Sequence, residues 1–179
     1  MSELSRARFR DVVLPHLGDA LAFARWLTGN GHDAEDVVQE ACIKALAGIE
    51  GYAGGSPKAW LLTIVRNAAF TWLARNRPKS LVLVGEVESL EQSAFQAEVT
   101  RQALAEGPEA DLIARAEAAE LEAAIASLPQ PFREVLVLRD INELSYREIA
   151  AMLSIPIGTV MSRLSRARGL VLAELERLP

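Results

Sequence analysis

Short hydroxyl and arginine side chains recur on one face of a helix expected near the C-terminal end of the chain. Apolar residues over 157–175 recur at steps of three and four, which predicts an amphipathic helix. The residues expected on its exposed face and flanks are Thr159, Met161, Ser162, Arg163, Ser165 and Arg166. Arginine can bond a guanine edge with two N–H groups or hold a phosphate. These residue types on one helix face indicate contact with the DNA major groove.

A second helix is expected just before this one, joined to it by a tight turn. Ser145 is a good N-cap, and Glu148 three residues later completes a capping box. Ser154–Ile155 is the expected turn, and Pro156 suits the first position of the next helix. The expected buried stripe of that next helix is Ile157, Val160, Leu164, Ala167, Val171 and Leu175. The pair is predicted to be a helix-turn-helix whose second helix reads DNA. An ordinary helical hairpin with a solvated basic face is the alternative.

Basic and aromatic residues are mixed along another expected helix, which Ser56 should cap and Pro57 should open. Its polar residues are Arg66, Asn67, Thr71, Arg75 and Arg77, with Phe70 and Trp72 among them. Bases stack on aromatic rings and cations follow the backbone of a single strand, so this mixture suits single-stranded nucleic acid. A helix with aromatic core residues and a basic end that its dipole favours is an equally good interpretation of the residues alone.

An acidic face is expected on an earlier helix, capped by Asp33. Asp36, Gln39 and Glu40 lie off its apolar stripe, although the helix dipole alone favours acids in a first turn. Cys42 falls on the buried side and is interpreted as a small core residue rather than a nucleophile.

Alanine and leucine dominate the 179 residues and strand-like alternation is scarce, which predicts an all-α fold. Half of the residues are apolar, which is enough for a packed core. The net charge of −5 is unevenly distributed. Residues 1–85 carry +2, residues 86–122 carry −8 and residues 123–179 carry +1, counting Lys and Arg against Asp and Glu. The acidity therefore lies in one central segment between two slightly basic ends.

Two small helical domains are expected, over 4–78 and 110–178, joined by an acidic flexible linker over 79–109. Pro78 ends the first domain, and few contacts are expected to cross the linker.

Other classes of function find little support. One cysteine allows no intrachain disulfide, which fits a reducing cytoplasm, and the sequence predicts neither a signal peptide nor a membrane span. His16 and His32 lack partners at metal-ligand spacing, and no set of residues suggests catalysis. We therefore expect no cofactor, no metal and no enzyme activity.

Two sets of segments resemble bacterial sigma factors of the sigma-70 family, in the short layout of the extracytoplasmic-function (ECF) group. Asp33–Glu40 followed by Trp60–Asn67 resembles sigma region 2. Leu128–Arg139, then Leu144–Ala151 and Gly158–Arg168, resembles sigma region 4. The resemblance covers nearly the whole chain except the linker.

The resemblance implies a transcription initiation factor that binds core RNA polymerase, reads promoter DNA and is controlled by an anti-sigma factor. Region 2 would dock on the clamp coiled coil of the β′ subunit through Asp36, Gln39 and Glu40. It would also hold the −10 element, with Asn67, Trp72, Arg75 and Arg77 as candidate contacts. Region 4 would read the −35 element through the exposed residues of its second helix, Thr159, Met161, Ser162, Arg163, Ser165 and Arg166.

The chain departs from the family pattern at three positions. Thr71 stands where an aspartate is usual, and Met161 and Gly169 stand where basic residues are common. These differences leave the promoter sequence preference open.

Two functions of other classes remain as hypotheses. A sigma-like decoy that sequesters an anti-sigma factor should lose the arginines of the reader helix, yet Arg163, Arg166 and Arg168 are present. A dimeric helix-turn-helix repressor would leave the first eighty residues without a role.

Overall fold

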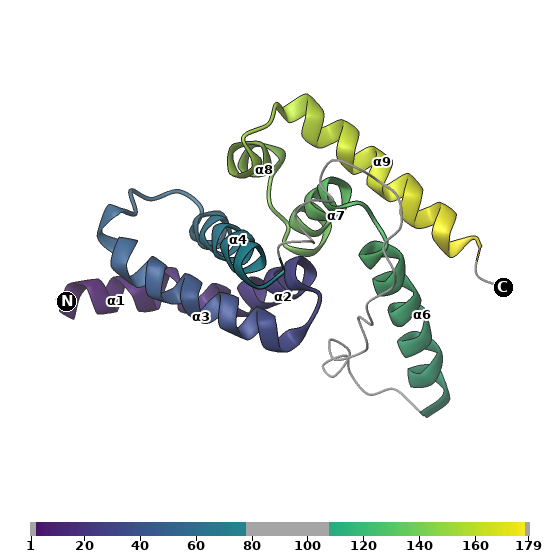
Figure 1. Cartoon of the computed structure of the whole chain (residues 1–179), viewed down its shortest axis with the longest axis horizontal. Coiled ribbons are helices and arrows are strands. Elements are labelled where there is room, and N and C mark those ends of the chain that lie inside the picture. Colours follow the sequence, from purple (N-terminus) through teal and green to yellow (C-terminus); the bar gives the residue numbers. More distant parts are fainter. Residues whose placement is uncertain (1–2, 78–107, 178–179) are drawn as a thin grey trace.

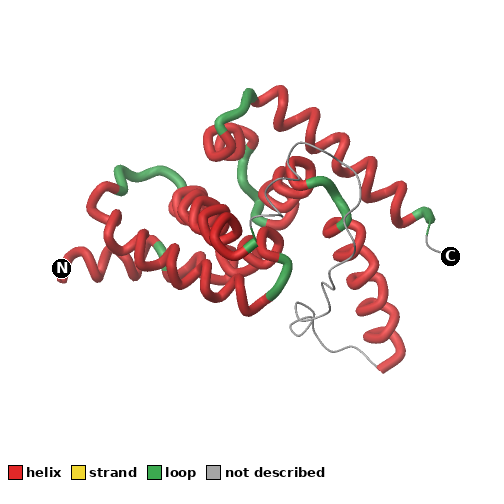
Figure 2. Tube along the Cα trace, viewed as in Figure 1, coloured by secondary structure: helices red, strands yellow, loops and turns green. Residues whose placement is uncertain are grey.

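The computed structural model describes residues 3–77 and 108–177, and every regular element in those ranges is a helix (Figures 1 and 2). The prediction of an all-α fold is therefore confirmed. The linker expected over 79–109 lies outside the described residues except for its last two, which belong to a helix. In chain order the elements are α1 (Glu3–Val12), η1 (Leu14–His16), α2 (Leu17–Thr28), α3 (Gly31–Gly48), η2 (Ile49–Gly51), α4 (Pro57–Asn76), α6 (Pro108–Ala126), α7 (Gln130–Leu136), η5 (Val137–Ile141), α8 (Tyr146–Leu153) and α9 (Ile157–Leu175).

The N-terminal half is built on three helices, α2, α3 and α4, that pack against one another. Their apolar stripes meet in a core whose fully buried side chains include Phe23, Val37, Leu61, Leu62 and Val65. The cap predicted for α4 is confirmed, since the Ser56 side chain accepts a hydrogen bond from the Ala59 N–H. This cap fixes where α4 begins and therefore which of its side chains face outward.

The start of α3 differs from the prediction that Asp33 is its cap. Gly29 ends α2 in the left-handed region, and the extended residue Asn30 then begins α3 at once. The Asn30 side chain accepts a 2.8 Å hydrogen bond from the Asp33 N–H, so Asn30 is the N-cap and Asp33 lies in the first turn. This leaves the Asp33 carboxylate available for a partner outside its own helix.

The C-terminal half contains the predicted helix-turn-helix, formed by α8 and α9. The capping box of Ser145 and Glu148 is confirmed, and Ser154 closes α8 in the left-handed region with φ 54°. Pro156 is the N-cap of α9 rather than its first residue. One buried position was wrong: Ile157 is 42% exposed. It is the first residue of α9, so no preceding turn covers it.

The two halves contact each other directly, at a few points only. The Arg66 guanidinium on α4 pairs with the Glu134 carboxylate on α7, and the Glu134 side chain is only 6% exposed. Lys58, at the start of α4, donates a 3.2 Å hydrogen bond to the Asn142 carbonyl. Phe23 on α2 and Val137 line one small crevice between the halves. Figure 1 shows α4 beside α7 and α8.

We expect Glu134→Gln to loosen this contact. The substitution keeps the shape of the side chain but leaves the half-buried Arg66 without its counter-charge, and breaking a buried pair costs about 3–5 kcal/mol. Separation of the halves would let water solvate Arg66. The radius of gyration from small-angle X-ray scattering should therefore rise, while the helical circular dichroism stays unchanged. Glu176→Gln is the matched control, because Glu176 is exposed near the C-terminal end. An unchanged radius of gyration in Glu134→Gln would contradict the expectation.

Candidate nucleic-acid and polymerase interfaces

The expected reader face lies on the outer side of α9, opposite the residues that bury the helix. The buried residues are Val160, Leu164, Ala167 and Val171. Four of the predicted contact residues are exposed, namely Met161, Ser162, Ser165 and Arg166. Thr159 and Arg163 are half-buried at the margins of that face. The structure thus brings all six predicted residues onto one helix and leaves most of them open to a ligand.

Two arginines of α9 differ in what they contact. The Arg166 guanidinium lies over the Phe132 ring, 5.5 Å from its centre, which holds an exposed cation in place without neutralising it. Arg168 instead makes two hydrogen bonds to the Asp140 carboxylate, of 2.7 and 3.0 Å. Arg168 therefore links α9 to η5, whereas the positive charge of Arg166 stays available to a ligand.

Glu148, part of the capping box of α8, also interacts with residues of the N-terminal half. Burial tends to raise the pKa of the Glu148 carboxyl. Hydrogen bonds from Ser145 and Ser56, together with the positive charge of Lys58, outweigh that effect and hold the pKa of Glu148 below its ordinary value. The Glu148 carboxylate is thus stabilised by the N-terminal ends of both α8 and α4.

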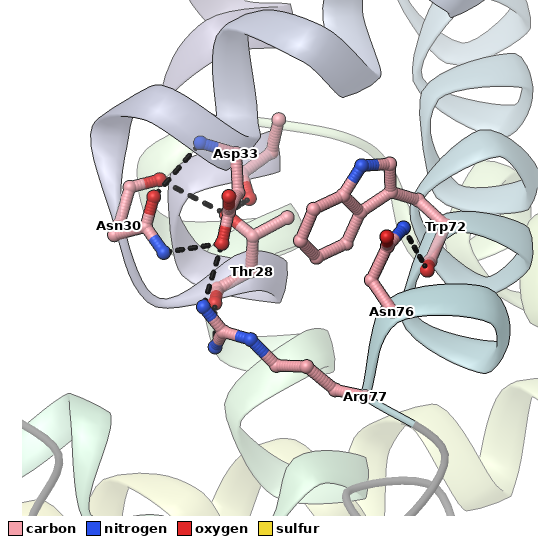
Figure 3. Close-up of polar contacts among 7 residues, drawn as sticks. Thr28, Asn30, Asp33, Trp72, Asn76 and Arg77 are labelled. Carbon is pink, nitrogen blue, oxygen red and sulfur yellow. Dashed lines mark hydrogen bonds and ion pairs between the residues drawn. The ribbon is translucent and has the colours of Figure 1, made fainter.

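The candidate −10 contacts on α4 fall into two groups. Asn67 and Arg75 are exposed, and their spacing of eight residues puts them on one side of the helix. Trp72 is half-buried near the end of α4. Arg77, whose side chain is 42% exposed, lies against the turn between α2 and α3, where it bonds the Thr28 carbonyl at 3.1 Å and the Asp33 carboxylate at 2.6 Å (Figure 3).

The candidate polymerase contacts lie along one face of α3. Asp36 and Gln39 are exposed, and Glu40 is half-buried in a 2.7 Å ion pair with Lys44. Ile43, which the sequence analysis missed, is 65% exposed on the same face. Its spacing of seven from Asp36 and four from Gln39 was the available signal. A single exposed apolar residue is common on protein surfaces, so Ile43 supports a contact surface only together with Asp36 and Gln39 beside it.

Other kinds of site find no support in the described part of the chain. Across 3–77 and 108–177, no three His, Cys, Asp or Glu side chains lie close enough together to hold a metal ion. No helix within those ranges has the length and apolar character to cross a membrane. Burial raises the pKa of the Cys42 thiol, which disfavours the reactive thiolate.

Comparisons with known proteins agree with the two halves of the structure. The family described as Sigma-70 region 2 matches residues 12–79, and the family described as Sigma-70, region 4 matches residues 118–171. The ECF RNA polymerase sigma factor EcfG of Rhodopseudomonas palustris is 37% identical, covering 89% of this chain and 80% of that protein. The ECF sigma-E factor of Escherichia coli K12 is 36% identical, covering 76% and 70%.

The chain belongs to the ECF group of RNA polymerase sigma factors. Sigma factors are transcription initiation factors and not enzymes. The chain is also 35% identical to the ECF sigma factor SigE of Mycolicibacterium smegmatis, of which it spans 58% of the length.

Two solved structures resemble the whole fold. The sigma factor RpoE of Bartonella quintana, crystallised with the anti-sigma factor NepR, matches with a TM-score of 0.68 and 28% identity, over 96% of this chain and 98% of that one. CnrH in complex with the cytosolic domain of CnrY matches with a TM-score of 0.61 and 26% identity, over 96% and 89%.

Arg166→Ala and Leu164→Ala should separate DNA reading from folding. Loss of the exposed Arg166 should weaken binding to −35 DNA by about 1–3 kcal/mol. Its stacking on Phe132 contributes only about 0.5–1 kcal/mol of stability. Leu164 is buried, so Leu164→Ala should lower the free energy of unfolding by about 2–5 kcal/mol. Fluorescence anisotropy with duplex DNA and thermal melting measure the two effects; equal melting losses for the two variants would show that the faces are misassigned.

Acid should remove one stabilising charge from α8. The pKa of Glu148 is lowered in the folded protein, so its charge stabilises the fold at neutral pH and that stabilisation is lost as the pH falls through the folded pKa. Glu148→Gln keeps the capping geometry without the charge. The melting temperature of the wild type should exceed that of Glu148→Gln at pH 7, and the difference should begin to shrink below about pH 4.3, the ordinary pKa of a glutamate, and be lost as the pH falls through the lowered folded pKa. A difference independent of pH would contradict the assignment.

Proposed function

We propose that this sigma factor binds core RNA polymerase in the cytoplasm and directs it to promoters by reading −10 and −35 elements. The observation that carries the proposal is the presence of two outward faces in one chain. One is the face of α9 with exposed hydroxyl, methionine and arginine side chains. The other is the face of α3 with Asp36, Gln39 and Ile43 exposed.

The −35 element is read by α9 in the major groove. Arg166 is exposed and held by Phe132, so its fork can reach a guanine edge or a phosphate at little cost in side-chain order. Met161 is 53% exposed, and its apolar side chain suits the methyl group of thymine. Ser162, Ser165, Thr159 and Arg163 complete the surface. A methionine in place of the cation common in the family moves part of the contact from phosphate attraction to shape and apolar contact.

The −10 element is held by α4. Asn67 and Arg75 offer an amide and a cation on one exposed side, and Trp72 offers an aromatic edge nearby. A separated strand presents both phosphates and unstacked bases, so this combination fits single-stranded DNA better than a duplex groove. A contact between Arg77 and this element stays a prediction, because the Arg77 guanidinium is bonded to Thr28 and Asp33 within the protein.

Core polymerase is bound through α3, with the β′ clamp coiled coil as the partner of Asp36, Gln39 and Glu40. Ile43 gives this surface an apolar residue that water solvates poorly. Acidic groups around an apolar residue give complementarity to a basic surface and a desolvated contact at the same time. Lys44 competes for Glu40 in the free protein, because their ion pair lies at the edge of the same face.

An anti-sigma factor controls this activity. The Bartonella quintana RpoE structure was solved in complex with the anti-sigma factor NepR, and the CnrH structure in complex with the cytosolic domain of CnrY. Their likeness extends over 96% of this chain, so both halves have counterparts in these two complexes. An inhibitor that contacts both halves would hold them in an arrangement that polymerase and promoter cannot use.

Transcription in vitro with core polymerase and genomic promoter fragments tests the proposal. Specific transcripts should require this protein and should disappear when the matching anti-sigma factor is added. Failure to bind core polymerase at micromolar concentration would refute the proposed function.

Gln39→Ala combined with Glu40→Ala should abolish core binding while leaving the fold intact. Exposed complementary charges mostly govern encounter, so residual association should be slower and less sensitive to salt. The lost pair with Lys44 is worth only about 0.3–0.5 kcal/mol, so helicity and melting temperature should hardly change.

Lys44→Ala is the matched control for this double variant. It removes the same ion pair but leaves the acidic face intact, so core affinity should be preserved. Unchanged core affinity in the double variant at both low and moderate salt would remove α3 from the interface.

A further inference from the structure

Arg77 lies at the C-terminal end of α4 and holds together the ends of three helices. Its N–H groups bond the carbonyl of Thr28, the last residue of α2, at 3.1 Å and the carboxylate of Asp33, in the first turn of α3, at 2.6 Å. The Asn30 side chain, which caps α3, also donates to that carboxylate. Figure 3 shows the guanidinium directly against the turn between α2 and α3.

This arrangement differs from that of a cation held ready for DNA. The Asp33 side chain is 15% exposed, so a phosphate that recruited Arg77 would leave a largely covered carboxylate without its counter-charge. It would also leave the Thr28 carbonyl without this donor. Arg75, two residues earlier, is exposed and faces no comparable cost.

Arg77 and Asp33 lie between the proposed polymerase face of α3 and the proposed −10 surface of α4. Asp33 lies one turn before Asp36, on the helix that bears the proposed polymerase surface. Arg77 follows the end of the helix that bears Trp72 and Arg75, and its guanidinium lies 5.8 Å from the centre of the Trp72 ring. In Figure 3 the Trp72 indole points toward the same turn as Arg77. The Arg77–Asp33 ion pair therefore holds the start of α3 next to the end of α4.

We propose that Arg77 is a positioning residue rather than a DNA contact. Through Asp33 and the Thr28 carbonyl it fixes the end of α4, and with it Trp72 and Arg75, relative to the face of α3 that docks on polymerase. This inference rests on the proposed function. Strand capture by the −10 surface requires a set distance from the docked helix, and small misplacements of binding groups lower reaction rates steeply.

Variants of the full-length chain distinguish the two roles of Arg77. A phosphate contact tolerates lysine, which binds phosphate as a point charge, whereas lysine cannot span the Thr28 carbonyl and Asp33 together. Arg77→Lys and Arg77→Ala should therefore both slow promoter opening by the holoenzyme, by roughly tenfold. Asp33→Asn should do the same, and combining it with Arg77→Ala should add nothing further.

Salt dependence gives an independent reading. Removing a phosphate contact lowers the slope of log affinity against log salt by about 0.7 for single strands and about 0.9 for duplex DNA. Arg77→Ala should leave that slope at the wild-type value, and Arg75→Ala should lower it. Glu35→Gln is the matched control for Asp33→Asn, because Glu35 is an exposed acid in the same part of α3. It should leave promoter opening unchanged.

Two results would overturn the proposal. One is a fall in the salt slope for Arg77→Ala equal to that for Arg75→Ala. The other is promoter opening by Arg77→Lys at the wild-type rate. Core affinity is measured on the same proteins, and the variants should keep it, because their docking face is intact.

A readout without polymerase separates this proposal from the proposed function. Amide hydrogen exchange over 70–76 should be faster in Arg77→Ala and in Asp33→Asn, by the same factor and without addition in the double variant. If the wild type failed to bind core polymerase, the proposed function would fall while this exchange result still showed the ion pair fixing α4. Unchanged exchange in both variants would overturn the positioning role by itself.

Discussion

A buried carboxylate must be paired, and Glu134 finds its partner in the other half of the chain. The Arg66 guanidinium comes from a residue 68 positions earlier, so one ion pair makes the packing of α7 depend on α4. Such a pair adds little net stability, because both groups lose their water when they meet. The same property makes it easy to reverse, since parting the halves returns water to both charges at once. An apolar surface of equal size would resist separation far more strongly.

Reversibility matters under the proposed function, because one chain that read both promoter elements would need its halves apart. Elements centred about 25 base pairs from each other lie roughly 85 Å apart along B-DNA, at about 3.4 Å per base pair. Among residues 3–77 and 108–177, no element covers the exposed side chains of the reader face of α9 or those of Asn67 and Arg75 on α4. Because the two halves are packed together, the reader face of α9 and the exposed side of α4 lie closer to each other than the two promoter elements do. Arg66 also lies next to Asn67 on α4, so the contact between the halves adjoins the proposed −10 surface.

Helix capping and apolar periodicity predicted much of this fold. Both act between residues close in sequence, so a sequence pattern can reveal them. The capping box of Ser145 and Glu148, the cap at Ser56 and most of the buried stripe of α9 follow from spacing alone. The errors at Asp33 and Ile157 arose at helix ends, where one residue changes whether a side chain is covered. The partners of Arg66, Lys58 and Arg77 lie 39 or more residues away, and no local pattern specifies such pairs.

The arginines show why the candidate site could be predicted only in part. Sequence patterns put Arg75, Arg77 and Arg166 in one class of exposed cations suited to nucleic acid. The structure divides them by partner: Arg166 rests on an aromatic ring that leaves its charge available, whereas Arg77 bonds a carboxylate and a carbonyl. A paired cation contributes little to the attraction of phosphate, because its field is cancelled by a neighbour at hydrogen-bond distance. For a chain with a net charge of −5, affinity for DNA therefore depends on the few arginines whose partners leave their charge available, and tertiary contacts decide which those are.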